Sequence, residues 1–283
     1  MDFATDAALA LMPAVREAAR EAGRIACRYF ERGAKTTARI WSKHGGSPVT
    51  EADVAVDSFL KVELSAALPA AAWLSEETAD DPARLDARRV WIVDPIDGTR
   101  AFLSGHPDWC VAIALLIDGE PVLGVIAAPA HDTLYEGCRG GGAYRDSAPI
   151  TASVRERLAG ASAAGPKPLI ERLERAAGRV EAVPRIPSLA LRLARVAEGA
   201  VDLGLVSGSS RDWDLAAADL ILTEAGGRLT TFAGRRPRYN AAEPVHGELL
   251  AAPAGLHPYL IEAMTGQPRK RPPHSDPCPP ESP

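Results

Sequence analysis

Three observations in the sequence predict an α/β fold of the α+β kind. Residues 5–31 carry apolar side chains at helical spacing among Arg and Glu, which predicts a helix. Residues 109–118 and 121–128 are apolar runs of strand length, and the Asp-Gly-Glu between them is typical of a hairpin turn. Residues 213–225 are again helical in character and end at two glycines.

The region before the predicted hairpin continues this alternation. Residues 33–49 are rich in Gly and Thr and predict a loop or hairpin. Thr50 followed by Asp53 resembles a capping box, so we expect a helix from there to Leu68, just before Pro69.

Two short apolar segments, residues 73–74 and 90–93, are each followed by acidic residues. Residues 73–74 form a short apolar step that ends in Ser-Glu-Glu, and the polar residues 78–88 predict a loop. Residues 90–93, Val-Trp-Ile-Val, are typical of a buried strand. Asp94 and Asp97 follow at the point where we expect that strand to leave the core.

The second half of the chain alternates in the same way. The expected elements are short strands at 134–136 and 143–144, helices at 166–177, 187–198 and 213–225, and strands at 201–206, 228–232 and 248–252.

Composition limits the classes of function. The 283 residues are 46% hydrophobic and carry a net charge of -5 with no basic run in the body of the chain, which argues against a nucleic-acid partner. No apolar run reaches membrane-spanning length, and the N-terminus lacks a signal-peptide pattern. Four scattered cysteines without a C-x-x-C pair suit a reducing compartment and argue against zinc. We therefore expect a cytoplasmic protein with neither a membrane nor nucleic acid as its partner.

The body of the chain and its tail differ in composition. We expect one domain over residues 1–266, in two intimate lobes of about 1–150 and 151–266. The segment 267–283 has 7 prolines in 17 residues and little apolar content, which predicts a disordered tail.

Carboxylates gather at the ends of the predicted elements. Glu76 follows an apolar step, Asp94 and Asp97 follow a strand, and Asp53 and Asp214 lie at helix starts. No Lys or Arg lies between Asp94 and Asp97 to neutralise them, and half-buried carboxylates need a partner. Oxygen ligands without His or Cys favour Mg²⁺, with Mn²⁺ as the alternative.

Each acidic site also has a structural interpretation. Asp53 and Asp214 are typical helix caps, Glu76-Glu77 is typical of surface charge, and Asp-Pro-x-Asp-Gly is typical of a turn. The occurrence of all these pieces in one chain is harder to explain in this way, because together they match one known family in content and order.

Four segments together resemble the inositol monophosphatase superfamily of Mg²⁺-dependent, lithium-sensitive phosphatases. They are SPVTEAD (47–53), LSEE (74–77), WIVDPIDGT (91–99) and WDLAAADLILTEAGG (213–227), and the resemblance runs from about residue 5 to 262. It implies a layered αβαβα sandwich, two or three Mg²⁺ per site, a small phosphate ester as substrate, and a homodimer.

The resemblance also implies roles for matching positions. The implied metal ligands are Glu76, Asp94, Asp97, Asp214 and the carbonyl of Ile96. Glu76 and Thr99 are expected to orient the attacking water, with Asp53 supporting Thr99 or metal-bound waters from the outer shell. The N–H groups of Gly98 and Thr99 are expected to hold the phosphate, and Asp214 is expected to contact the substrate as well. Such phosphoryl transfer rests on positioning and charge neutralisation and needs no Ser-His-Asp set.

The substrate is less clearly indicated. Inositol monophosphatases carry an acidic residue seven positions before the last metal-binding Asp, and Ser207 stands there in this chain. Residues 188–199 resemble a segment of bacterial 3'(2'),5'-bisphosphate nucleotidases, with Arg192 where they have a Lys near the second phosphate. An Arg suits a phosphate as a bidentate donor, although an exposed helix Arg is the plainer interpretation. Trp109, Trp213 and Tyr239 are candidates to stack on a base.

We therefore expect adenosine 3',5'-bisphosphate, a by-product of sulfate assimilation, to be hydrolysed to AMP and phosphate. Inositol 1-phosphate, histidinol phosphate and fructose 1,6-bisphosphate are the alternatives within the class. An alternative of another class is a moonlighting protein that binds RNA polymerase or ribosome-assembly complexes, as some members of this family do.

Overall fold

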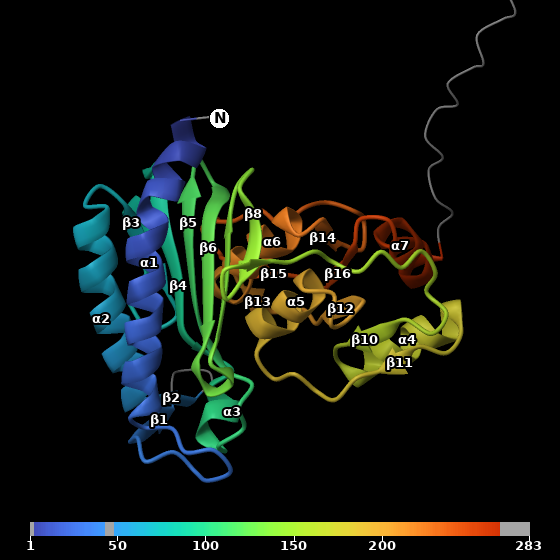
Figure 1. Ribbon diagram of the computed structural model, residues 1–283, viewed down its shortest axis with the longest axis horizontal. Helices are drawn as coiled ribbons and strands as arrows, with labels where there is room; N and C mark the ends of the chain where they lie inside the picture. Colours follow the sequence, from blue (N-terminus) through green and yellow to red (C-terminus); the bar gives the residue numbers. More distant parts are fainter. Residues whose placement is uncertain (1–2, 43–47, 267–283) are drawn as a thin grey trace, which may run out of the picture.

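The computed structural model describes residues 3–42 and 48–266, which form five alternating layers of helices and sheets (Figure 1). Two long helices, α1 (Phe3–Cys27) and α2 (Glu51–Ala67), cover one face of a seven-stranded sheet. The helices α5 (Leu189–Ala197) and α6 (Asp212–Glu224) separate this sheet from a five-stranded one. The expected layered αβαβα sandwich is thereby confirmed.

The larger sheet is built entirely from consecutive strands. β3 runs parallel to β4, and every other neighbouring pair is antiparallel. In spatial order the strands are β3 (Ala72–Ser75), β4 (Arg89–Asp97), β5 (Cys110–Ile117), β6 (Glu120–Ala128), β7 (Thr133–Cys138), β8 (Gly142–Arg145) and β9 (Ala148–Pro149).

The smaller sheet mixes parallel and antiparallel pairs, and α4 (Lys167–Ala177) and α7 (His257–Thr265) pack against it. Its spatial order is β11 (Glu181–Ala182), β10 (Ser162–Ala164), β12 (Leu203–Val206), β16 (Leu249–Pro253) and β14 (Gly227–Thr231). The remaining elements are the two-stranded pairs β1 (Ile40–Ser42) with β2 (Pro48–Thr50) and β13 (Ser210–Arg211) with β15 (Val245–His246), the 3₁₀ turns η1 (Pro82–Asp86) and η2 (Pro129–His131), and the short helix α3 (Thr99–Leu103).

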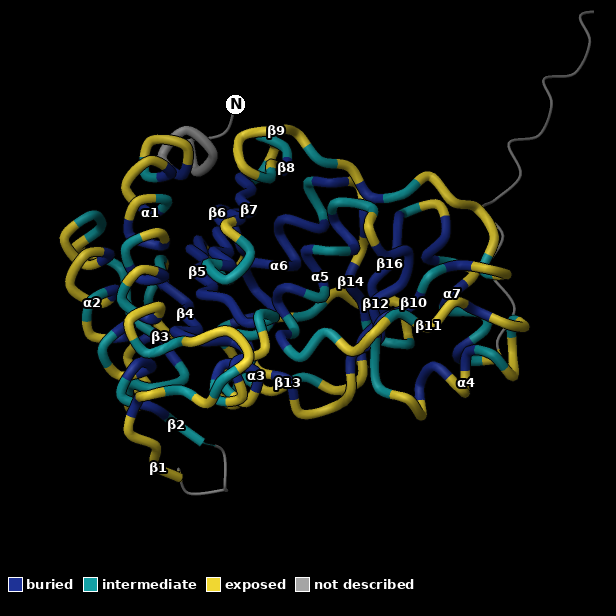
Figure 2. The backbone as a smooth tube through the Cα atoms, turned by 60° about the horizontal axis from the view of Figure 1, so that its bottom comes forward, coloured by how far each residue is buried: buried dark blue, intermediate teal, exposed yellow. Residues whose placement is uncertain are grey.

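Three apolar cores lie between the layers, and Figure 2 shows the buried backbone concentrated there. The first joins α1 and α2 to one face of β4, β5 and β6. The second joins the opposite face of the same strands to α5 and α6, and the third joins the smaller sheet to α4 and α7. Because strands β4–β6 are covered on both faces, their sequences are continuous apolar runs.

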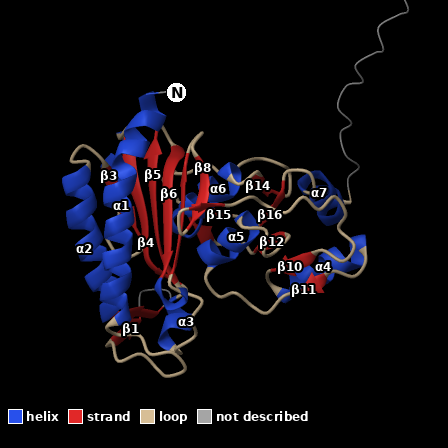
Figure 3. Cartoon of the chain, in the orientation of Figure 1, coloured by secondary structure: helices blue, strands red, loops and turns tan. Residues whose placement is uncertain are grey.

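Most predicted elements are present among the helices and strands that Figure 3 shows, and the structure differs from the prediction at the following places. The expected strand at 90–93 extends to Asp97, so both carboxylates lie within β4 and do not follow it. The expected loop 78–88 contains η1, because Asp81 caps a 3₁₀ turn that begins at a proline. The helix α7 and the short strands β10, β11, β13 and β15 carry little periodicity and were not predicted. The predicted disordered tail lies outside the described residues.

Helix α6 carries a buried acidic side chain, Asp219. Asp219 accepts a hydrogen bond from the Tyr239 hydroxyl at 2.9 Å, and its other oxygen has no hydrogen-bond partner among the described residues. Burial raises the pKa of Asp219 to about 6. The folded state therefore binds this proton more tightly than the unfolded state does, and stability falls as the pH rises from about 4 through 6.

We expect Asp219→Asn to melt at a higher temperature than the unaltered protein at pH 8 and at a similar temperature at pH 4. The shift of the Asp219 pKa from 3.8 to about 6 corresponds to about 3 kcal/mol between these limits. Thermal melting across the pH range measures the difference, with Asp118→Asn, a change in an exposed turn, as the control. Parallel melting curves for Asp219→Asn and the unaltered protein would show that Asp219 is not held protonated.

Candidate active site

An irregularity in β4 brings Asp94 and Asp97 to the same place. Residues three apart in a regular strand point to opposite faces of the sheet. Here the pairing with β5 shifts register between Asp94 and Asp97, and the intervening Pro95 has no N–H to give to the ladder. The Ile96 N–H donates to Asp94 Oδ1 at 3.0 Å and closes this local bend.

The third carboxylate comes from α6, more than a hundred residues further along the chain. Asp214 is the third residue of that helix, and its Oδ2 accepts the Arg211 N–H at 2.7 Å. Asp94, Asp97 and Asp214 each present one carboxylate oxygen such that the three atoms lie within 4.8 Å of one another. Asp214 is therefore both a helix cap, as its structural interpretation expects, and a member of the acidic cluster.

This cluster has an excess of negative charge. Burial raises the pKa of Asp94 well above its usual range, and the charges of Glu76, Asp97, Asp214 and Asp53 raise it further. Within residues 3–42 and 48–266, no Lys or Arg forms an ion pair with the three clustered carboxylates.

The pKa values of the other two carboxylates are also raised, mainly by burial. The charge of Asp97 raises the pKa of Asp214 further. The hydrogen bonds that Asp97 accepts lower its own pKa and so oppose the effect of burial on it. Three neighbouring carboxylates that repel one another are a suitable site for a hard divalent cation, because one such ion would neutralise the charge of all three.

Hydrogen bonds from the start of α5 fix Oδ2 of Asp97. Ser188 Oγ donates to Asp97 Oδ2 at 2.5 Å, and the Ala190 N–H donates to the same oxygen at 2.6 Å. Ser188 also caps α5 by accepting the Leu191 N–H at 3.0 Å. Cys110 Sγ lies 3.3 Å from Ser188 Oγ in the same buried group. These contacts leave Oδ1 of Asp97 as the oxygen that can hold a ligand.

The turn that carries Glu76 is held by a buried carboxylate on α2. Asp57 accepts hydrogen bonds from the Ser75 hydroxyl and, at 2.6 Å, from the Thr78 hydroxyl. These two hydroxyls flank Glu76, so Asp57 fixes the turn on both sides. Glu76 is close enough to the cluster for its charge to raise the pKa of both Asp94 and Asp214.

Asp53 forms the capping box that the sequence predicted. Thr50 N donates to Asp53 Oδ2 at 2.7 Å, the Thr50 hydroxyl donates to it at 2.5 Å, and Asp53 N donates back to that hydroxyl at 3.3 Å. The charge of Asp53 also contributes to the raised pKa of Asp94. Asp53 therefore caps α2 and lies near the acidic cluster.

The chain turns sharply after Asp97. Gly98 has φ +92°, and a Cβ there would lie 3.0 Å from the Asp108 carbonyl oxygen, so this position requires glycine. The Thr99 hydroxyl donates to the Ile96 carbonyl at 3.1 Å. Within the described part of the chain, the N–H groups of Gly98 and Thr99 donate to no acceptor.

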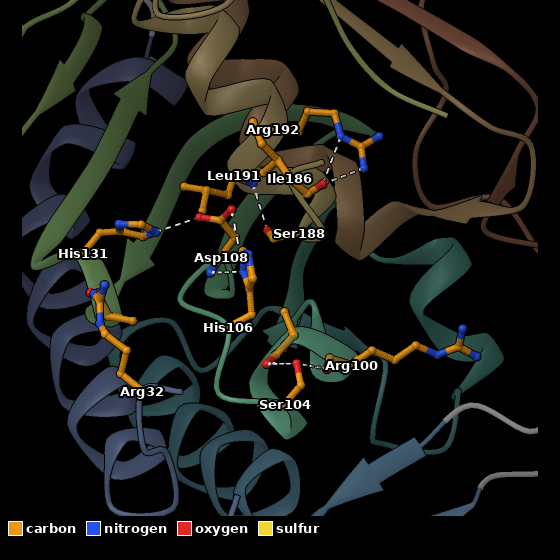
Figure 4. A network of polar contacts seen from close by, with 12 residues as sticks. Arg32, Arg100, Ser104, His106, Asp108, His131, Ile186, Ser188, Leu191 and Arg192 are labelled. Carbon is orange, nitrogen blue, oxygen red and sulfur yellow. Dashed lines mark hydrogen bonds and ion pairs between the residues drawn. The ribbon is translucent and has the colours of Figure 1, made fainter. Parts of the chain in front are cut away.

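Arg192 and Ser207, the two residues singled out for specificity, line one cavity of about 580 Å³. Arg192 is largely buried, which corrects its interpretation as an exposed helix residue. Its Nη2 donates to the Ile186 carbonyl at 2.8 Å and its Nη1 to the Leu205 carbonyl at 3.2 Å. Figure 4 shows Arg192 and Ser188 projecting from the same end of α5.

Two of the three aromatic candidates for stacking are enclosed by the core. Trp109 is fully buried and Tyr239 is 7% exposed, so neither presents a ring face to a ligand. Trp213 is only partly buried. The expectation of a stacking surface at Trp109 or Tyr239 is therefore wrong.

Comparison with known proteins identifies the family. The family model described as "Inositol monophosphatase family" matches residues 10–268, and the chain belongs to this family. Its relatives are phosphatases, the family is metal-dependent, and the chain is accordingly a phosphoric monoester hydrolase.

Individual relatives carry different substrate names. A histidinol-phosphatase of Mycobacterium tuberculosis is 37% identical over 80% of this chain and 88% of its own length. An inositol-1-monophosphatase of Mesorhizobium japonicum is 35% identical over 84% and 91%. The 3'(2'),5'-bisphosphate nucleotidase CysQ of Aggregatibacter actinomycetemcomitans is 32% identical over 82% and 88%. The extragenic suppressor protein suhB of Bartonella henselae superposes with a TM-score of 0.78 at 30% identity, over 90% of this chain and 98% of that one.

The described helices include none that combines the length and apolar character required to cross a membrane.

Proposed function

We propose that this chain is a Mg²⁺-dependent phosphomonoesterase whose site is the cluster of Asp94, Asp97 and Asp214. The convergence of two buried carboxylates and a half-buried one, with none of which a described Lys or Arg forms an ion pair, supports this most directly. Bound divalent cations, two or three in number with Mn²⁺ as the alternative, would neutralise the phosphate and lower the pKa of a water molecule.

The residues of the chain would bind the cations and orient the attacking water. Asp94, Asp97, Asp214, Glu76 and the Ile96 carbonyl would hold the cations. The Thr99 hydroxyl already donates its hydrogen to Ile96, so its lone pairs are available to accept a hydrogen from water. Glu76 would accept the other hydrogen, which directs an oxygen lone pair towards phosphorus.

The phosphate itself needs hydrogen-bond donors. The N–H groups of Gly98 and Thr99 directly follow Asp97 in the chain, and they would donate to the oxygen atoms of the phosphate. Asp53, close enough for its charge to raise the pKa of Asp94, would act from outside by ordering Thr99 or water. These residue roles follow the family resemblance.

For the substrate, we favour a 3'(2'),5'-bisphosphate nucleotide such as adenosine 3',5'-bisphosphate. The cavity that Arg192 lines is also lined by Lys167 and Arg185, so three cations face one space. Ser207, which stands where inositol enzymes have an acid, adds a hydroxyl and no negative charge. Ser188, whose hydroxyl binds Asp97, caps α5, and Arg192 follows about one helical turn later, so one helix end contributes to both the cluster and the cavity. A second phosphate suits this lining.

Histidinol phosphate is the second candidate, because a relative at 37% identity bears that name. Histidinol carries an ammonium group beside its imidazole ring, and the three cations that line the cavity would repel that group. Inositol 1-phosphate and fructose 1,6-bisphosphate complete the set of candidate esters, and of these two only fructose 1,6-bisphosphate brings a second phosphate. Assembly as a homodimer, inhibition by lithium and a role in sulfate assimilation stay predictions.

Phosphate release with Mg²⁺ from these four esters tests the substrate. We expect adenosine 3',5'-bisphosphate to give the highest kcat/KM. The double change Lys167→Ala with Arg185→Ala should lower that value about tenfold or more, since each lost charged contact is worth about 1 kcal/mol at an exposed site. The same change should leave inositol 1-phosphate nearly unaffected.

Arg175→Ala is the matched control, because Arg175 is an exposed cation on α4 that does not line the cavity. If inositol 1-phosphate or histidinol phosphate is hydrolysed best by a wide margin, the substrate proposal is wrong while the phosphatase site stands.

A further inference from the structure

The two sides of the acidic cluster come from separate parts of the chain, and a buried bridge joins them. Glu76 lies on the segment that leads from β3 into η1, whereas Asp214 lies on α6. The bridge consists of Arg84 in η1, Asn240 in the loop after β14, and Asp212 at the start of α6. None of these three was identified from the sequence as part of the site.

Arg84 and Asn240 bind one another reciprocally. Arg84 is 1% exposed, and its Nη1 donates to Asn240 Oδ1 at 2.7 Å. In return, Asn240 Nδ2 donates to the Arg84 carbonyl at 3.0 Å. Asp80 takes the other edge of the guanidinium in a bidentate pair at 2.5 and 2.8 Å. The segment that follows Glu76 is therefore fastened to Asn240 by both its main chain and a buried cation.

Asn240 in turn holds the start of α6. Its N–H donates to Asp212 Oδ2 at 2.7 Å, and His246 Nε2 lies 2.7 Å from Asp212 Oδ1. Asp212 is fully buried and its own N–H donates to the Pro244 carbonyl at 3.2 Å. Since Asp212 is the first residue of α6 and Asp214 the third, this anchoring sets where Asp214 projects.

We propose that Asn240 is a positioning residue that sets the spacing between the Glu76 side and the Asp214 side of the metal site. The inference rests on the proposed function, because it takes these carboxylates to be metal ligands. Asn240 has φ +59°, a conformation that Asn adopts more readily than most residues. Its amide supplies at one point both a donor and an acceptor, which neither Asp nor Gly does.

The test changes the Asn240 side chain and keeps its backbone conformation. Asn240→Gly retains the left-handed conformation and the N–H bond to Asp212 but removes both contacts to Arg84. We expect Mn²⁺, titrated into the metal-free full-length chain by calorimetry, to bind about tenfold more weakly or worse, the usual effect of removing a group that orients metal ligands. The Mg²⁺ concentration for half-maximal phosphatase activity should rise to match, and saturating Mg²⁺ should restore most of kcat.

Two further variants complete the test. Ser147→Gly is the control, since Ser147 also has a left-handed backbone (φ +68°) but lies in an exposed turn; it should bind Mn²⁺ as the unaltered chain does. Asn240→Asp, which keeps the acceptor for Arg84 and loses the donor, replaces Asn240→Gly if the latter does not fold, and should also weaken Mn²⁺ binding.

The outcomes separate the two proposals. A folded Asn240 variant with unaltered Mn²⁺ affinity overturns the positioning role while leaving the phosphatase proposal intact. Lost activity that saturating Mg²⁺ does not restore, at unaltered Mn²⁺ affinity, also overturns it. Failure of the unaltered chain to bind Mn²⁺ overturns the proposed metal site first, and the positioning role with it.

Discussion

Asp94→Asn should lower kcat by a factor of about 10³ or more while the protein stays folded. Asp94 lies close enough to Glu76, Asp97 and Asp214 for their charges to raise its pKa. Replacing it with a neutral amide removes one charge from the proposed cation site. The amide oxygen can still accept the Ile96 N–H, so the bend in β4 should persist.

Although Asp94→Asn should lower activity, we expect it to leave thermal stability unchanged or to raise it. In the metal-free protein the buried charges repel one another, so Asp94→Asn should melt at the same or a higher temperature than the unaltered chain at pH 8. Phosphate release and thermal melting measure the two effects, with Asp132→Asn, at an exposed turn, as the control. Near-normal turnover by Asp94→Asn would refute its assignment as a ligand.

Mg²⁺ should stabilise the protein, and more strongly at high pH than at low pH. The pKa values of Asp94, Asp97 and Asp214 are raised in the metal-free fold, so the folded state holds protons that the unfolded state releases. Stability of the metal-free protein therefore falls as the pH rises through these raised values. A bound cation removes this loss, because it takes the place of the protons.

At a Mg²⁺ concentration 100-fold above its Kd, the stabilisation is about 2.7 kcal/mol, or a rise in Tm of about 5–10 °C. We expect this rise near pH 8 and little of it near pH 5. Melting in Mg²⁺ and in chelator, at ionic strength matched with K⁺, separates specific binding from screening. A shift of equal size at both pH values would argue against displacement of protons from the cluster.

The sequence predicted the local features of the site well. The capping box at Thr50 and Asp53 and the helix beginning near Asp214 follow from residue types at fixed short spacing, and both are present. The continuous apolar runs of β5 and β6 predicted strands because they are buried on both faces. The acidic groups at the ends of these elements could be recognised in the same way.

Long-range contacts could not be predicted from the sequence. Ser188 and Asp97 are 91 residues apart, and Arg84 and Asn240 are 156 apart, so no local spacing pointed to either pair. The bend that turns Asp94 and Asp97 to one place depends on a register shift against β5, which periodicity does not reveal. Arg192 illustrates the same limit, because its burial comes from β12 and the segment before α5.

The most direct test of the metal site is a crystal structure of the protein soaked in Mn²⁺ with inorganic phosphate, with data collected near the Mn absorption edge. We predict anomalous peaks between Asp94, Asp97 and Asp214, with a phosphate contacting the N–H groups of Gly98 and Thr99. Anomalous density elsewhere in the molecule, with none between these three carboxylates, would contradict the account.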